Sequence, residues 1–160
     1  MIIDDHEVVR RGIAEVVERS DGMTVVAEAA SVAEGVRRAE LVRPQVLLVD
    51  LQLPDGTGID IMSRLRESLP ESRSIVLTSF DDDDALAEAL EVGAAAYLLK
   101  SVRGAEIADV VRAVAAGRRR GATTPAWRRR QSPAPTQKRC ASRPPKNPLG
   151  LTMSVRNSAM

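Results

Sequence analysis

The chain has very little cysteine, few aromatic residues and no long apolar run. Its 160 residues include one cysteine, Cys140, so an intrachain disulfide is excluded and a reducing compartment is favoured. One Phe, one Tyr and one Trp leave little aromatic surface for stacking on nucleic-acid bases. No apolar run reaches the roughly 18 residues needed to span a membrane, and no signal-peptide pattern opens the chain. These absences predict a cytoplasmic protein without membrane contact.

Acidic residues are missing from the last quarter of the chain. Residues 1–116 hold all 22 acidic residues and 12 basic ones, a balance of −10, whereas residues 117–160 hold 11 basic residues and no acidic one. The length gives room for one domain of ordinary size. We therefore predict one domain over residues 1–116 and a separate basic segment over residues 117–160.

The basic segment is rich in proline and arginine. It contains six prolines, two RRR triplets and no apolar periodicity, which is typical of disordered chains. No amphipathic recognition helix can be drawn through it, so DNA binding by this chain is not expected. Binding of nucleic-acid phosphates through the arginines is a weaker alternative.

Short apolar runs alternate with amphipathic stretches along the predicted domain. The runs are residues 1–3, 23–27, 46–49, 75–77 and 96–99. They are continuous rather than alternating, as strands buried on both faces are. Between them, apolar residues recur at helical spacing, as follows: Val8, Ile13, Val16 and Val17; Val32, Val36, Ala39 and Leu41; Ile59, Ile61, Met62, Leu65 and Leu69; Leu86, Leu90 and Val92; Ile107, Val110, Val111 and Val114. The alternation predicts an α/β domain with a parallel sheet covered by helices on both faces.

Turn and cap residues fall between these stretches. Gly22, Pro44, Pro70 and Gly93 separate the expected elements, and Ser31 and Asp82 are expected to cap helices. The acidic run at residues 81–84 is expected to complement a helix dipole rather than to bind a metal.

Polar residues follow four of the five apolar runs. Asp4 and Asp5 follow the first run, Asp50 the third, Thr78 the fourth and Lys100 the fifth. Because parallel strands end at one edge of a sheet, these side chains are expected to converge there. Crowded carboxylates need a cation among them, and hard oxygen ligands suit Mg²⁺. A lysine and a hydroxyl beside them would bind an anion, and a carboxylate can attack phosphorus. The pattern predicts a site that accepts a phosphoryl group on an aspartate.

Four motifs together resemble the receiver domain of two-component response regulators. They are DDHEVVRRG, VLLVDLQLPDGTGID, IVLTSFDDDD and GAAAYLLK, and the likeness covers residues 1–116. The details are most similar to the NarL/FixJ class, and within it to regulators of the DosR/DevR type. The resemblance implies a (βα)5 flavodoxin-like (CheY-like), doubly wound parallel sheet with strand order 2-1-3-4-5.

The resemblance also implies roles for individual residues. Asp50 would be the phosphoacceptor, and Asp4, Asp5, Asp50 and the backbone carbonyl of Gln52 would hold Mg²⁺. The switch and phosphate-binding residues would be Thr78, Tyr97 and Lys100, and the residues that shape the loop after the acceptor would be Pro54 and Gly58. His6 is a lone imidazole beside this site, and a loop residue is favoured over a ligand or phosphodonor.

The implied function is phosphorylation-dependent signalling. A sensor histidine kinase would supply the phosphoryl group, and the domain would catalyse only its own phosphorylation and dephosphorylation. A homodimer through the helices expected around residues 86–92 and 107–114 and the strand expected at residues 96–99 would be the usual output. Members of this class continue into a helix-turn-helix domain that regulates transcription, and none is visible after residue 116. The abrupt change there suggests a translated alternative frame or a degraded gene, with a functional basic segment as the alternative.

Two other functions remain open. A stand-alone receiver would act by protein contact or by competing for a kinase. An aspartyl-phosphate phosphatase of the haloacid dehalogenase kind is disfavoured, because that family has a second Asp where Gln52 stands. The first strand also raises a question, since only three residues, about 10 Å of strand, precede Asp4. Either the true start lies upstream, or the first strand is shortened at a cost in stability.

Overall fold

The computed structural model describes residues 1–79 and 83–118. The expected cap at Asp82, and the predictions of disorder and of nucleic-acid binding for residues 119–160, lie outside these ranges. The helix expected after the acidic run begins at Asp83, inside that run. None of the helices in the described part of the chain has the length and apolar character of a membrane span.

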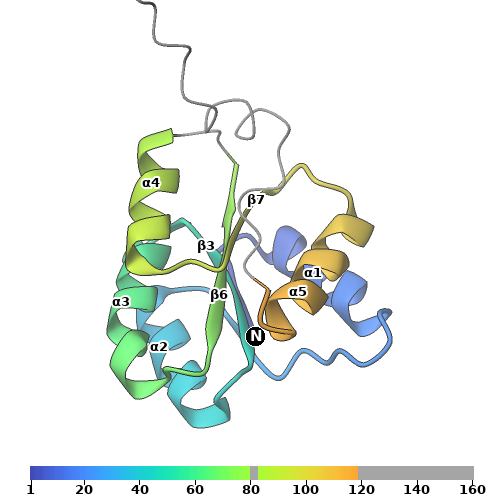
Figure 1. Cartoon of the computed structure of the whole chain (residues 1–160), viewed down its shortest axis with the longest axis horizontal. Helices are drawn as coiled ribbons and strands as arrows, with labels where there is room; N and C mark the ends of the chain where they lie inside the picture. Colours follow the sequence, from blue (N-terminus) through green and yellow to red (C-terminus); the bar gives the residue numbers. More distant parts are fainter. Residues whose placement is uncertain (80–82, 119–160) are drawn as a thin grey trace, which may run out of the picture.

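A five-stranded parallel sheet forms the centre of the domain (Figure 1). Its strands, in spatial order, are β2 (Glu28–Ala29), β1 (Ile2–Ile3), β3 (Val46–Asp50), β6 (Arg73–Thr78) and β7 (Ala96–Leu99). A separate antiparallel pair, β4 (Gln52–Leu53) and β5 (Gly56–Thr57), follows β3. If only the strands of this sheet are numbered, in the order of the chain, the spatial order is 2-1-3-4-5. The predicted topology and the shortened first strand are therefore confirmed.

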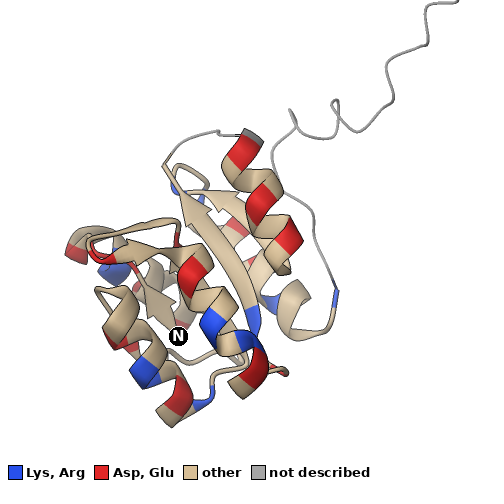
Figure 2. Ribbon diagram, turned by 90° about the vertical axis from the view of Figure 1, so that its left-hand side faces the viewer, with Lys and Arg blue, Asp and Glu red and all other residues tan. Residues whose placement is uncertain are grey.

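Helices cover both faces of the sheet (Figure 1). One face carries α1 (Glu7–Glu18) and α5 (Gly104–Ala115), and the other carries α2 (Val32–Val42), α3 (Gly58–Ser68) and α4 (Asp83–Val92). Figure 2 shows that the charged residues lie mainly on the helices and loops, while the strands are largely uncharged.

Alternate residues of each central strand pack on opposite faces of the sheet. Leu48 of β3 packs with residues of α1 and α5, whereas Leu47 and Val49 pack with residues of α2 and α3. The same alternation divides Ile75 and Val76 of β6 between opposite sides of the sheet. Burial on both faces explains why the strands are continuous apolar runs.

Three residues predicted on buried helix faces were placed wrongly. Val8, Leu41 and Leu90 are exposed. Each is adjacent in the sequence to a residue that packs on the buried side of its helix. Because consecutive residues are about 100° apart around the helix axis, its own side chain points toward solvent. The helices themselves are confirmed, as is the cap at Ser31, whose Oγ accepts a hydrogen bond from the Glu34 N–H at 3.2 Å.

The second strand was also predicted in the wrong place. It covers Glu28–Ala29 rather than residues 23–27, although the Ala27 carbonyl still accepts a hydrogen bond from the Ile2 N–H. β1 is only two residues long and pairs with residues 28 and 29. In this parallel register, residues 23–26 precede the residues that pair with β1, and they pair with no strand in the described part of the chain.

The amino group of Met1 is buried at the start of β1. It donates a hydrogen bond to the Val46 carbonyl at 2.9 Å, and the Met1 residue is 7% exposed. Burial lowers the pKa of this ammonium from 8.0 to about 6. The folded domain therefore holds this proton less tightly than an unfolded chain does.

The free energy of unfolding is expected to rise between about pH 6 and pH 8 because of this group. In that window the unfolded chain keeps the amino proton and the folded domain releases it, so raising the pH favours the folded state. The contribution is about 3 kcal/mol at most, because a lowering of the pKa from 8.0 to about 6 costs about 1.4 kcal/mol per pKa unit. Urea unfolding across this range measures it, with the same chain acetylated at Met1 as the control. Equal pH slopes for the two proteins would contradict the assignment.

Candidate functional site

Four polar side chains meet where the central strands end. Asp4 follows β1, Asp50 ends β3, Thr78 ends β6 and Lys100 follows β7. Asp4, Asp50 and Thr78 are the buried polar or charged residues in the described part of the chain. Because the strands are parallel and adjacent, the sheet brings them to one edge, as the sequence predicted.

Lys100 joins the two buried carboxylates. Its Nζ lies 2.8 Å from Asp4 Oδ2 and 2.5 Å from Asp50 Oδ2. Burial alone would lower the pKa of Lys100, but the two carboxylates outweigh it and raise that pKa above its usual value. Burial raises the pKa of Asp50, and the nearby Lys100 opposes this only in part. Burial therefore disfavours the charged form of the Asp50 carboxyl group.

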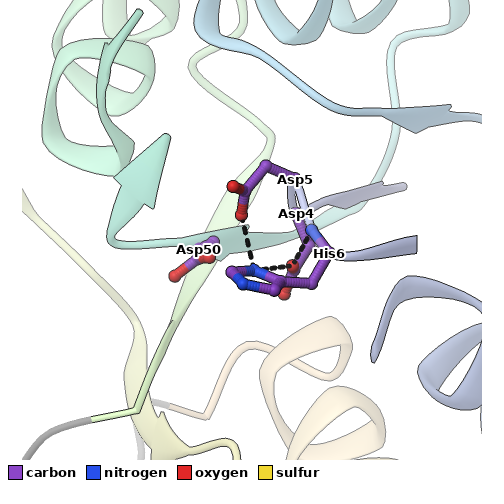
Figure 3. Close-up of side chains that lie close together, drawn as sticks. All are labelled: Asp4, Asp5, His6 and Asp50. Carbon is purple, nitrogen blue, oxygen red and sulfur yellow. Dashed lines mark hydrogen bonds and ion pairs between the residues drawn. The ribbon is translucent and has the colours of Figure 1, made fainter. Parts of the chain in front are cut away.

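The group of side chains around Asp50 can hold a cation. One ligand atom from each of Asp4, Asp5, His6 and Asp50 lies within 4.8 Å of the others (Figure 3). The side chain of Asp4 is fully buried, and its Oδ2 is paired with the Lys100 ammonium at 2.8 Å. Three carboxylates with an open side toward solvent fit Mg²⁺, which keeps several of its waters.

A cavity of about 200 Å³ opens over this edge of the sheet. Its lining includes Asp5, Asp50, Gln52, Thr78 and Lys100, together with Pro54 and His6. The Gln52 N–H also donates to Asp50 Oδ1 at 3.3 Å. A larger cavity of about 290 Å³ lies beside Met1 and Val46, at the opposite edge of the sheet and away from the carboxylates.

Three residues of the predicted site lie outside the cavity lining. Asp4 is fully buried beneath the cavity, where it contacts Lys100. Tyr97 is 2% exposed and packs in an apolar cluster with Met62, Val76 and Leu86. Gly58 is buried beneath Asp50, where a Cβ atom would come within 2.5 Å of the Asp50 carbonyl oxygen. The loop after Asp50 can return this close only because residue 58 has no side chain.

Helix caps hold the loop that follows Asp50. The Asp55 carboxylate accepts hydrogen bonds from the N–H groups of Val32 and Ala33 at 2.6 and 3.0 Å, which ties the loop to the start of α2. Thr57 and Asp60 form a capping box at the start of α3. The Thr-x-x-Asp spacing was a usable signal for this box. The bond across to α2 had no signal in the sequence.

Arg10 is a second residue that the sequence did not reveal. Its Nη1 donates to the Asp4 carbonyl at 2.7 Å, and its Nε donates to Glu28 Oε2 at 3.0 Å. The guanidinium group thereby links the loop that carries Asp4 and Asp5 to β2. A single arginine in an amphipathic helix gives no sign of such a contact.

Known proteins are similar to this chain in sequence. The sequence profile of the response regulator receiver domain matches residues 1–112. The DNA-binding transcriptional activator DevR/DosR of Mycobacterium tuberculosis is 42% identical over 117 residues, which cover 73% of this chain and 54% of that protein. The chain spans about half the length of the curated relatives it matches.

Solved structures share the fold as well. A LuxR-family two-component response regulator from Aurantimonas sp. SI85-9A1 superposes with a TM-score of 0.74 and 34% identity, over 81% of this chain and 91% of that chain. A response regulator from Burkholderia pseudomallei gives a TM-score of 0.64 and 27% identity, over 72% of this chain and 67% of that chain. The latter structure contains a phosphorylated aspartic acid, a calcium ion and citrate.

Proposed function

Because the chain belongs to the response regulator receiver family of two-component systems and is related to NarL/LuxR-type regulators, we propose that it accepts a phosphoryl group on Asp50. A sensor histidine kinase, or a small donor such as acetyl phosphate, supplies the group in the presence of Mg²⁺. The observation that carries the proposal is the buried contact of Lys100 with Asp4 and Asp50 at the strand ends.

Asp50 is the nucleophile in this proposal. One of its carboxylate oxygens forms a bond to phosphorus while the bond from phosphorus to the donor breaks, and the leaving group takes that electron pair. A bound Mg²⁺ would neutralise charge on the carboxylates and on the phosphoryl oxygens. The Gln52 N–H and the Lys100 ammonium, which already contact Asp50, hold the carboxylate in place.

Lys100 and Thr78 would detect the new charge. The phosphoryl group adds almost two negative charges beside them. A lysine-phosphate contact near 4 Å has a Coulomb energy of about 4 kcal/mol at an effective dielectric of 20. Shifting a two-state equilibrium from 1:99 to 99:1 takes about 5.5 kcal/mol. The combined energy of a few such contacts, after the cost of desolvation is subtracted, is therefore large enough to drive a switch.

The output proposed for this switch is the face formed by α4, β7 and α5. Tyr97 lies on β7 with its side chain buried, and in this proposal the inward position belongs to the switched state. A homodimer through this face is the proposed consequence. One named relative is a DNA-binding transcriptional activator, which supports a transcriptional origin for this receiver. A stand-alone receiver that acts by protein contact is the alternative output.

Labelling by acetyl phosphate is expected to require Mg²⁺. Intact-protein mass spectrometry should show the mass of one added phosphoryl group with Mg²⁺ and no addition in EDTA, and excess Mg²⁺ should restore labelling. The reason is that the three carboxylates of the site repel an incoming phosphoryl group without a cation. Equal labelling in EDTA would contradict the proposal. Sustained release of phosphate from small esters would instead support the phosphatase.

A further inference from the structure

The imidazole of His6 is turned toward the carboxylates of the site (Figure 3). Its Nδ1 lies 2.7 Å from Asp5 Oδ1 and 3.6 Å from Asp4 Oδ1, and its backbone N–H donates to Asp4 Oδ1 at 2.9 Å. The side chain is 66% exposed, so the ring lies at the mouth of the site rather than in the core. The sequence favoured a loop residue with no role, whereas the structure places the ring next to the carboxylates of Asp4 and Asp5.

A histidine changes which metal ions the site prefers. Carboxylate and water ligands suit Mg²⁺, whereas an imidazole nitrogen suits Zn²⁺, Co²⁺ and other first-row transition ions. Lys100 already neutralises part of the carboxylate charge. Binding of a dication therefore depends more strongly on any additional donor, and the imidazole is the one nitrogen donor of this type in the chain.

Small movements of the side chains would let one ion reach all four of them. Zinc bonds to nitrogen and carboxylate oxygen are about 2.0–2.2 Å long, so donor atoms on one ion lie no more than about 4.4 Å apart. The ligand atoms of Asp4, Asp5, His6 and Asp50 lie within 4.8 Å of one another. Movements of less than about 1 Å would complete the set. Asp5 and His6 would separate slightly to admit the ion between them.

We propose that His6 completes a mixed nitrogen and oxygen site with Asp4, Asp5 and Asp50, which binds Zn²⁺ and Co²⁺ in competition with Mg²⁺. The inference rests on the proposed function, because it uses the same carboxylates. It goes beyond that function by assigning a ligand role to His6 and a second class of metal to the site. Transition ions would then exclude Mg²⁺ from the receiver.

Removing the imidazole tests this assignment. Calorimetric titration of the full chain with Zn²⁺, Co²⁺ and Mg²⁺ is compared for the parent and His6→Asn, both carrying Cys140→Ser so that the thiol cannot bind zinc. Loss of an inner ligand should weaken Zn²⁺ and Co²⁺ binding by about tenfold or more and change Mg²⁺ binding by less than about twofold. Zn²⁺ and Co²⁺ affinities that do not depend on His6 would overturn the proposal.

A second measurement needs no substitution at His6. The chain has one histidine, so its imidazole gives a single set of proton resonances. These should shift on addition of Zn²⁺, and excess Mg²⁺ should reverse the shift. Resonances that do not move when Zn²⁺ binds would also overturn the proposal. Acetyl phosphate labelling with Mg²⁺ is scored separately, so its failure alone counts against the proposed function and not against the role of His6.

Discussion

Asn in place of Asp50 is expected to abolish labelling by acetyl phosphate. The amide has nearly the shape of the carboxylate but lacks the negative oxygen that attacks phosphorus. Intact-protein mass spectrometry with Mg²⁺ provides the measurement. Asp21→Asn is the matched control, because it makes the same chemical change at an exposed position away from the site and should label normally.

The outcome for Asp50→Asn separates two causes of lost labelling. Circular dichroism and urea unfolding establish whether the variant is folded, since Asp50 is 4% exposed and contacts Lys100. A folded variant without label supports Asp50 as the nucleophile. Undiminished label on the folded variant would show that another residue accepts the phosphoryl group, and the proposed role of Asp50 would be wrong.

Replacing Gly58 with Ala is expected to produce the largest loss of stability. The new methyl group would lie 2.5 Å from the Asp50 carbonyl oxygen and 2.9 Å from a methyl carbon of Val49. Because the nearer atom belongs to the backbone of the central strand, it cannot rotate away. Overpacking of this kind costs about 3 kcal/mol. Urea unfolding measures the loss, and labelling of the folded fraction reports any displacement of Asp50.

Gly12→Ala is the matched control for Gly58→Ala. Gly12 lies on the exposed side of α1, and a Cβ atom there meets nothing within 4 Å. The same substitution should therefore stabilise the domain, by up to about 1 kcal/mol, through helix propensity. If Gly58→Ala were as stable as the parent protein, the close return of the loop beneath Asp50 would be refuted.

The sequence predicted the arrangement of the sheet and most of the polar residues that gather at the carboxyl ends of its strands. Residues such as Asp50 and Lys100 could be placed because each follows a buried apolar run, and parallel strands end together. Strand order came from the resemblance to a known family rather than from the runs themselves. The metal roles of Asp4, Asp5 and Gln52 and the switch roles of Thr78 and Tyr97 remain predictions, because they concern bound states.

Contacts between distant segments could not be predicted. Arg10 reaches the Asp4 carbonyl and Glu28, and Asp55 caps a helix more than twenty residues earlier in the chain. Neither contact has a local pattern. β2 was misplaced for a related reason: a strand needs a partner, and the two residues of β1 determine which residues can pair. Apolar character alone was not enough.

Locating the phosphoryl group on the wild-type chain tests the role of Asp50 most directly. After labelling with acetyl phosphate and Mg²⁺, borohydride reduces an acyl phosphate to an alcohol and leaves a phosphoimidazole unchanged, and tryptic fragments are then sequenced by mass spectrometry. If Asp50 is the phosphoacceptor, a single reduced residue, Asp50, is expected, and none when EDTA replaces Mg²⁺. Modification at His6 or at another carboxylate, with Asp50 intact, would contradict it.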